Sequence, residues 1–187
     1  MKEWSKHAAT CGKEIHRLFL PQARGGLGLH ISCLMVDPMH AIDLGVAPLL
    51  HGSALHLLVY HPTLSPIAGA TVGARAQVVW DMVQNAYREL KTPCRYSQLP
   101  VRMWTDEKAP HADYPDLTGK AAEQRHLVRP MYHIMKDLEG KGSNEVKQII
   151  GHLSLTYKYL DQVYQMLETR DDDGRKPVFW PVDVVEC

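Results

Sequence analysis

The sequence predicts a mainly α-helical fold with a few short strands, and three observations support this prediction. Apolar residues recur at spacings of three and four along four long segments. Prolines and glycines, which interrupt regular structure, separate these segments. The composition, with 45% hydrophobic and 22% charged residues in a chain of 187, is typical of a globular chain that buries a core. That composition excludes a disordered tail and a collagen-like rod.

The positions of the prolines and glycines, together with the composition, predict three regions along the chain. Residues 1–30 hold an N-terminal helix, rich in Lys and His, and a glycine-rich loop. Residues 31–169 form a helical core, and residues 170–187 form an acidic turn and a tail. Short apolar or β-branched runs are the candidates for the few strands. These runs are 30–36, 101–104 and 178–185.

The first core helix is expected at 37–60. Asp37 is a good N-cap, and Pro38 suits the first helical position, where the backbone N–H has no partner within the helix. Apolar residues then follow at helical spacing and predict one buried face. Pro48 lacks the N–H that a helix interior requires, so we expect it to kink or divide this helix.

Three further amphipathic helices are expected, each bounded by residues that stop a helix. Pro93 stops the second helix, and an irregular, proline-rich connection leads to the third. Gly140 and Gly142 predict a tight turn, so the third and fourth helices should form a hairpin. The fourth helix has the most regular apolar stripe in the chain. The three helices are expected at 74–91, 117–139 and 143–168.

Charge and cysteine content exclude several function classes. The 21 Lys and Arg residues balance the 21 Asp and Glu residues, so no overall basic excess indicates a nucleic-acid partner. None of the four cysteines forms a Cys-x-x-Cys pair, which argues against a zinc ribbon or a thioredoxin-type site. The apolar stretches are too short to predict a membrane span, and none follows Met1 as in a signal peptide. We therefore expect an intracellular protein with no membrane partner.

The sharpest polar pattern is Asp37 followed three residues later by His40, because residues at this spacing face the same way on a helix. From residue chemistry alone, Asp37 caps the helix and His40 bonds locally. A zinc site formed with Cys33 is the weaker interpretation, since zinc ligands usually come in tight pairs. Among the other histidines, which show no consistent partner, His51 and His56 lie among leucines and are expected to be hydrogen-bonded core residues.

The segment DPMHAIDLGVAPLLHGSALHLL resembles the Asp-x-x-His signature of eukaryotic cut-and-paste DNA transposases, most closely the CACTA-type enzymes. The matching positions are Asp37, Met39, His40, Leu44 and Gly45, whereas Ile42 and Asp43 depart from the pattern. In that superfamily the signature lies in an RNase H-like domain, after the second catalytic Asp and before the catalytic Glu. A helical insertion often precedes this Glu. The resemblance therefore implies the C-terminal part of such a domain together with its helical insertion.

The chemistry of this family uses three carboxylates to hold two divalent metal ions, Mg²⁺ or Mn²⁺, which promote phosphodiester cleavage. Glu123 is the candidate for the last carboxylate, as a catalytic residue and metal ligand, because it borders the apolar stripe of its helix. An ordinary solvated Glu is the alternative at such a position. The segment before Asp37 contains no Asp. The chain is thus expected to be a fragment or decayed copy that does not cleave DNA alone, with Mg²⁺ or Mn²⁺ bound only where the parent site is complete.

DNA is the partner that the resemblance implies, with the nucleus as location. Basic side chains would contact phosphates without reading bases, and Tyr96 and Trp104 would stack on bases. The basic candidates are Arg95, Arg102, Lys120, Arg125, His126 and Arg129. Acidic neighbours dilute this patch, so a mixed solvated face is the alternative. The alternative function is a non-catalytic helical module that presents the hairpin at 117–168 to a protein partner.

Overall fold

The computed structural model describes residues 39–168, which belong to one of two units into which the chain divides, Pro38–Cys187. The prediction of a mainly α-helical fold is confirmed, and residues 39–168 contain no strand. The helical elements are η3 (Met39–Val46), α2 (Ala47–Tyr60), α3 (Val72–Glu89), η4 (Val101–Met103), α4 (Ala121–Leu138) and α5 (Asn144–Glu168). The features predicted for residues 1–38 and 169–187, among them the Asp37 cap and two of the short strands, lie outside the described residues.

The first predicted core helix is divided, as Pro48 required. The π-helix η3 leads directly into the α-helix α2, and Pro48 lies in the first turn of α2, where the helix changes from one type to the other. By length and composition, Met39–Tyr60 is apolar enough to cross a membrane, contrary to our expectation from the apolar runs. However, 56% of the apolar window is buried within the fold, and buried helices of soluble proteins pass the same test, so the segment is weak evidence for a membrane span.

The second helix, α3, begins two residues earlier than predicted because Thr71 caps it. The Thr71 hydroxyl accepts a hydrogen bond from the Ala74 N–H at 3.1 Å, which satisfies one of the backbone donors that a helix start leaves open. After α3 the chain reverses at Lys91, whose φ of 51° lies in the left-handed region.

The predicted strand at 101–104 is wrong: this segment forms the 3₁₀ turn η4. The Met103 and Trp104 N–H groups bond back to the carbonyls of Pro100 and Val101, as in a 3₁₀ turn, while the Met103 and Trp104 carbonyls accept hydrogen bonds from the Thr118 and Asp116 N–H groups. The predicted stacking of Trp104 and Tyr96 on bases is also wrong. Their side chains belong to the core and are only 2% and 4% exposed, which leaves no ring face for a base.

The predicted hairpin of the last two helices is confirmed. Gly140 and Gly142 adopt φ values of 79° and 87° in the turn between α4 and α5, a conformation that glycine reaches without a Cβ clash. The deepest residues of α5 are Val146, Ile150, Tyr157 and Tyr164, whereas Leu153, Leu160 and Leu167 are partly buried. Both sets recur at spacings of seven, and the set with Ile150, Tyr157 and Tyr164 is the more deeply buried one.

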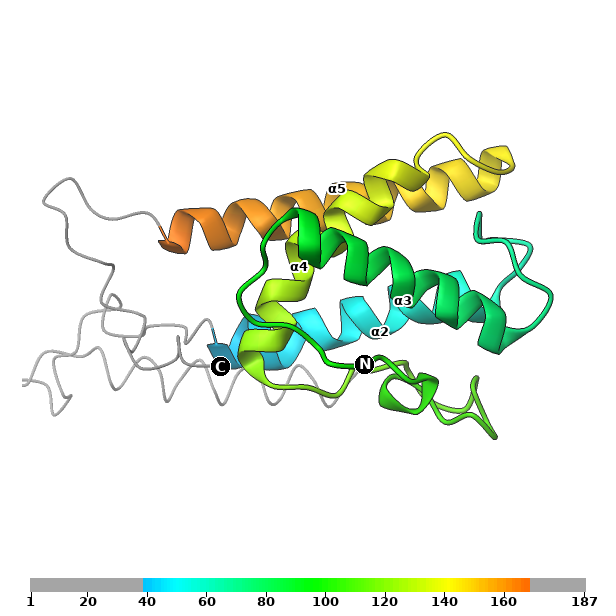
Figure 1. Cartoon of the computed structure of the whole chain (residues 1–187), viewed down its shortest axis with the longest axis horizontal. Coiled ribbons are helices and arrows are strands. Elements are labelled where there is room, and N and C mark those ends of the chain that lie inside the picture. The colour runs from blue at the N-terminus through cyan, green and yellow to red at the C-terminus, as the bar shows by residue number, and fades with distance from the viewer. Residues whose placement is uncertain (1–38, 169–187) are drawn as a thin grey trace, which may run out of the picture. The chain divides into compact units, whose positions relative to one another are not determined.

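Helix α4 lies at the centre of the fold, where it contacts η3, α2, α3 and α5 (Figure 1). Its buried side is a continuous apolar face that runs through Leu127, Met131, Ile134 and Leu138. Pro130 lies inside α4 and is buried with this face. The helix therefore brings residues of the first and last elements to one place.

Candidate functional site

A buried ion pair connects the signature segment to the C-terminal hairpin. Asp43, in η3, is completely buried. Its Oδ2 atom accepts a hydrogen bond from Arg125 Nη2 at 2.5 Å, and its Oδ1 atom accepts one from the Tyr164 hydroxyl at 2.5 Å. The Arg125 guanidinium also lies 5.7 Å from the centroid of the Tyr164 ring, within cation–π range. We call these three residues the Asp43 cluster.

The Asp43 cluster compensates for the burial of a carboxylate in an apolar helix. A buried charge is strongly destabilising unless a partner charge and hydrogen bonds replace its hydration. Arg125 supplies the charge and Tyr164 supplies the second hydrogen bond, so both carboxylate oxygens are engaged. Burial, and then the neighbouring Asp43, raise the pKa of Tyr164, so its hydroxyl remains a donor. The carboxylate thus holds η3, α4 and α5 together.

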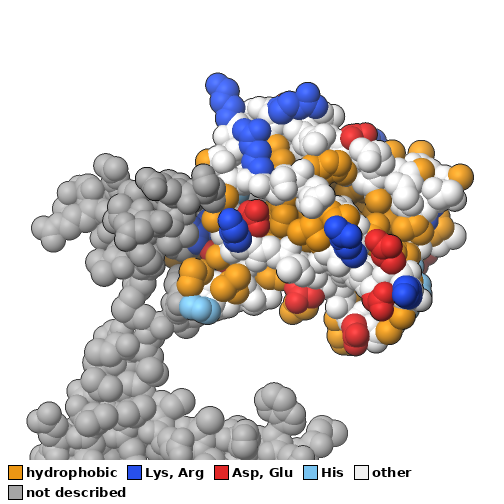
Figure 2. Space-filling model, turned by 60° about the horizontal axis from the view of Figure 1, so that its bottom comes forward, with side chains coloured by type: hydrophobic (Ala, Val, Ile, Leu, Met, Phe, Trp, Pro, Cys, Tyr) orange, Lys and Arg blue, Asp and Glu red, His pale blue; other side chains and the backbone are white. Residues whose placement is uncertain are grey.

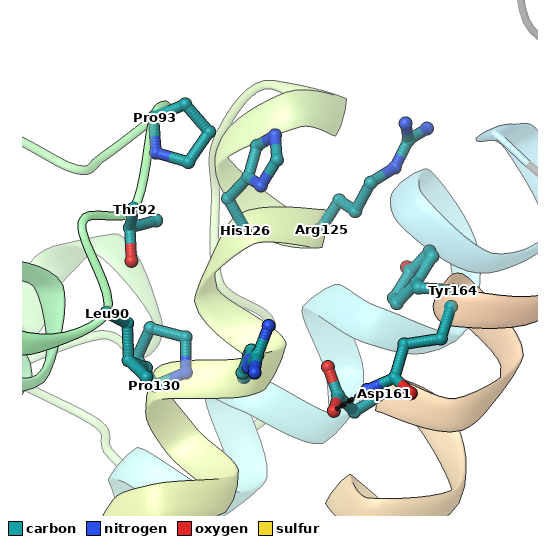
Figure 3. A pocket seen from close by; sticks show the side chains of 10 residues that line it. Leu90, Thr92, Pro93, Arg125, His126, Pro130, Asp161 and Tyr164 are labelled. Atoms are coloured by element: carbon teal, nitrogen blue, oxygen red, sulfur yellow. Dashed lines mark hydrogen bonds between the residues drawn. The ribbon is translucent and has the colours of Figure 1, made fainter. Parts of the chain in front are cut away.

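A cavity of about 260 Å³ opens beside the Asp43 cluster, between α4 and α5, and we call it the α4–α5 cleft. Arg125 and His126 approach it from α4, and Asp161 and Tyr164 approach it from α5 (Figure 3). The remaining lining residues are Leu90, Thr92, Pro93, Arg129, Pro130 and Gln165. The cleft therefore combines two Arg side chains and one His side chain on α4 with one carboxylate, one phenol and one amide on α5.

The charged groups of the α4–α5 cleft are divided between its two helices, with the cations on α4 and a carboxylate on α5. Arg129 is exposed and presents its guanidinium to solvent at the cleft. The pKa of His126 is lowered, mainly by burial and then by the positive charge of Arg125, while Asp43 partly opposes this effect. A neutral His126 offers one donor and one acceptor. Asp161 lies on the opposite side, where its Oδ2 accepts a hydrogen bond from Gln165 Nε2 at 2.7 Å.

Glu123, the candidate catalytic residue and metal ligand, has a structural partner. Its Oε2 atom accepts a hydrogen bond from the Lys120 N–H at 2.9 Å at the start of α4, which is the Glu half of a capping box. This bond explains why a carboxylate lies at the edge of the apolar stripe. His40 is exposed in η3. Asp37 lies outside the described residues, so the predicted convergence of Asp37, His40 and Glu123 stays a prediction.

The basic residues predicted to contact nucleic acid are only partly brought together. Arg125 and Arg129, with His126, line the α4–α5 cleft. The other three, Arg95, Arg102 and Lys120, are exposed elsewhere on the surface. Basic and acidic side chains are interspersed, with hydrophobic patches between them, on the face that Figure 2 shows.

Sequence reasoning missed two residues at the centre of the site: Asp43, which accepts hydrogen bonds, and Tyr164, which donates one to it. The available indication was an acid within an apolar helix, which must find a partner if its helix is buried. Sequence reasoning also missed a group of histidines: among residues 39–168, His56, His61 and His111 bring potential metal-ligand atoms within 4.8 Å of one another. Glu123 is not part of this group.

Comparison with known proteins adds no relative. No protein-family model, curated protein or solved structure matches the chain. The chemistry of the described residues is therefore the basis on which a function can be assigned.

Proposed function

We propose that this chain is the non-cleaving helical part of a transposase-like protein, and that its α4–α5 cleft contacts the phosphate backbone of DNA. The resemblance of the signature segment supports the first half of the proposal. The observation that carries the second half is the arrangement of Arg125, His126 and Arg129 around one cavity.

The cleft residues have different roles in this proposal. Arg129 is exposed, so it donates hydrogen bonds to a phosphate at little cost in desolvation. His126 adds a neutral donor beside it. The charge of Arg125 is largely balanced by Asp43, so Arg125 mainly shapes the cleft. Contacts to phosphate oxygens position a protein on DNA without reading its sequence, and binding of this kind is sensitive to salt.

The proposal assigns no strand cleavage to the chain. Both oxygens of Asp43 are engaged by Arg125 and Tyr164, and the Glu123 carboxylate caps α4. These carboxylates therefore do not fit a site for two divalent metal ions, which needs carboxylate oxygens directed at the metals. We derive no step through Mg²⁺ or Mn²⁺ from the described residues.

The salt dependence of binding to a labelled duplex, measured by fluorescence anisotropy, tests the proposal. Each phosphate contact contributes about one unit to the slope of log affinity against log salt, so Arg129→Gln should lower this slope by about 1 and weaken binding to all sequences alike. Lys136→Gln, which removes an exposed cation of the same helix outside the cleft, should leave the slope unchanged. Equal slopes for Arg129→Gln and the parent would contradict a phosphate contact in the cleft.

A helical protein-interaction module is the second candidate, and one observation favours it. Leu155, Tyr159 and Val163 lie four residues apart on α5 and are 46%, 58% and 39% exposed, which gives this helix an apolar outer stripe. Exposed apolar surface of this kind often marks a protein contact. If the DNA titration shows no effect of Arg129→Gln while the chain self-associates in sedimentation velocity runs, the second candidate is preferred.

A further inference from the structure

A cluster of three histidines lies where a loop meets the end of α2, and it shares no residue with the α4–α5 cleft. His56 is on the last turns of α2, and His61 follows the final residue of that helix. His111 belongs to the irregular segment between η4 and α4, fifty positions further along the chain. We call these residues the histidine cluster.

Local structure explains how His56 and His61 come close together. The two residues are five positions apart, a spacing that does not place side chains side by side on a continuous helix. However, α2 ends at Tyr60, and His61 leaves the helical conformation with a φ of −111° and a ψ of 75°. Its N–H still bonds to the carbonyl of Leu57 at 3.3 Å. The chain is therefore held at the helix end while its direction changes.

A close backbone contact brings the segment of His111 to α2. A Cβ atom at Gly52 would lie 2.6 Å from the Pro115 carbonyl oxygen, so only glycine allows this approach. The Leu117 N–H also donates a hydrogen bond to the Pro48 carbonyl at 3.0 Å. Because the segment is fixed to α2 a few residues beyond His111, the position of His111 near the helix end is restricted.

The three rings form a nearly equilateral triangle. The centroid of His56 lies 5.4 Å from that of His61 and 5.3 Å from that of His111, and the latter two centroids are 5.7 Å apart. Tyr60 stacks on His56 with a centroid distance of 4.8 Å and an interplanar angle of 16°, which restricts the orientation of the His56 ring. One nitrogen from each histidine lies within 4.8 Å of the others.

His56 has an unsatisfied nitrogen at this position. The residue is only 6% exposed, and its Nδ1 atom has no hydrogen-bond partner among the described residues. A buried polar atom without a partner is destabilising, so such atoms are rare in folded proteins. A cation held by His56 Nδ1 would give this nitrogen a partner, and neutral imidazole is the commonest protein ligand of transition metals.

We propose that His56, His61 and His111 bind one Zn²⁺ ion through three imidazole nitrogens, with water at the fourth position. A Zn–N distance of about 2.0–2.1 Å in tetrahedral geometry corresponds to nitrogens about 3.4 Å apart, so binding requires the three rings to close by roughly an ångström. His111 is exposed and on an irregular segment, so its side chain can supply this movement. The ion then ties the segment between η4 and α4 to the end of α2.

Acidic residues of the same segment make the surroundings favourable for a cation. Asp106 and Glu107 lie five and four positions before His111 and are exposed. Both carboxylates belong to the irregular segment that carries His111. Negative charges on this segment favour a divalent cation near His111.

The first test is zinc affinity of the full chain after removal of metal, measured by competition with a chromogenic zinc indicator. The parent should bind one Zn²⁺ per chain at the cluster. Loss of an outer-shell partner alone costs about 10–100-fold in metal affinity, so loss of a ligand in His111→Ala should exceed about 100-fold. His133→Ala, which removes an exposed histidine of α4, is the matched control and should bind as the parent does.

The second test separates histidine ligands from the four cysteines of the chain. With Co²⁺ in place of Zn²⁺, the parent should show visible d–d absorption without the intense near-ultraviolet band of thiolate coordination, and His111→Ala should lose this spectrum. Zn²⁺ should also slow tryptic cleavage after Lys108 in the parent but not in the variant. A thiolate spectrum, or equal Zn²⁺ affinity in the parent and a helical His111→Ala chain, overturns the proposal. If His111→Ala loses its far-ultraviolet helical spectrum, His61→Ala replaces it in both tests.

Discussion

Along the helix formed by η3 and α2, the buried polar side chains differ in whether they have hydrogen-bond partners. Toward the N-terminal end, Asp43 and His51 are fully buried and each has two hydrogen-bond partners. At the C-terminal end, His56 is buried with an unpartnered Nδ1 atom and lies beside two further histidines. His51 and His56 are only five residues apart and are both surrounded by leucines in the sequence.

The partners of His51 define its chemical state. Its Nε2 atom lies 3.0 Å from the Gln124 carbonyl, which only accepts, so Nε2 carries the proton and donates. Its Nδ1 atom then accepts from the Tyr157 hydroxyl at 3.0 Å. Burial lowers the pKa of His51 to about 4, although the bond to Gln124 opposes this effect. His51 is therefore a neutral core residue, as expected from the sequence, whereas His56 departs from that expectation because its ring is not fully satisfied.

This comparison teaches that burial alone does not distinguish a structural polar residue from a residue of a site. The distinguishing observation is whether every polar atom has a partner within the fold. By this criterion Asp43 and His51 are structural anchors, whereas His56, whose Nδ1 has no partner and which lies beside two further histidines, is a residue to examine for a ligand.

The largest expected effect is at the anchor. Asp43→Ala removes the charge that balances Arg125 and the acceptor of Tyr164, so it should lower the free energy of unfolding by about 3–5 kcal/mol. Urea denaturation at pH 7 measures this difference. Asp137→Ala, at an exposed position of α4, should change stability by less than about 0.5 kcal/mol. Similar values for the two variants would mean that the Asp43 cluster does not stabilise the fold.

The next effect is the response of stability to acid. The unfolded chain protonates His51 near its ordinary pKa of 6.5, whereas the folded chain does so only near 4, so stability falls as the pH falls through this window. His51 alone should account for a loss of about 3 kcal/mol between these two pH values.

Denaturation of the parent and of His51→Gln at several pH values between 6.5 and 4 isolates the contribution of His51. The pKa values of His56 and His126 are also lowered, mainly by burial, and add a loss of the same sign to both proteins. The parent should therefore show the steeper decline. If the two curves are parallel, His51 is not buried in its neutral form.

The smallest expected changes in the free energy of unfolding are those on substitution of His51 and His56, measured in the presence of a metal chelator. His51→Leu leaves the Tyr157 hydroxyl buried without a partner and should cost about 1–3 kcal/mol. His56→Leu removes a nitrogen that already lacks a partner, so it should be nearly neutral or slightly stabilising. Thermal or urea unfolding of both variants provides the comparison. Equal destabilisation by the two substitutions would remove the distinction between the two ends of the helix.

Sequence patterns predicted the helices of the described region well because helices are determined mainly by neighbours along the chain. The apolar spacing of three and four located α2 to α5 within a few residues, Pro48 divided the first helix, and Gly140 and Gly142 formed the hairpin turn. The 3₁₀ turn η4 was mistaken for a strand because a short apolar run shows no distinguishing period.

The candidate sites were predicted less well because they depend on contacts between distant parts of the chain. The basic residues of α4 were identified, but sequence reasoning passed over Asp43 and did not connect it with Tyr164, which lies 121 positions away. Glu123 was considered for its chemistry, whereas its backbone partner makes it a capping residue.

Within residues 39–168, the sequence by itself determined where the long helices lie and which face of each is apolar, because these properties follow from local hydrogen bonding and periodicity. Only the tertiary structure decided which buried polar atoms find partners. His51 and His56 occupy similar sequence surroundings, yet one meets Tyr157 and the backbone of α4, while the other meets His61 and His111. The physical reason is that the spacing of apolar residues predicts which face of a helix is buried. The packing of distant helices and loops decides which atoms contact that face.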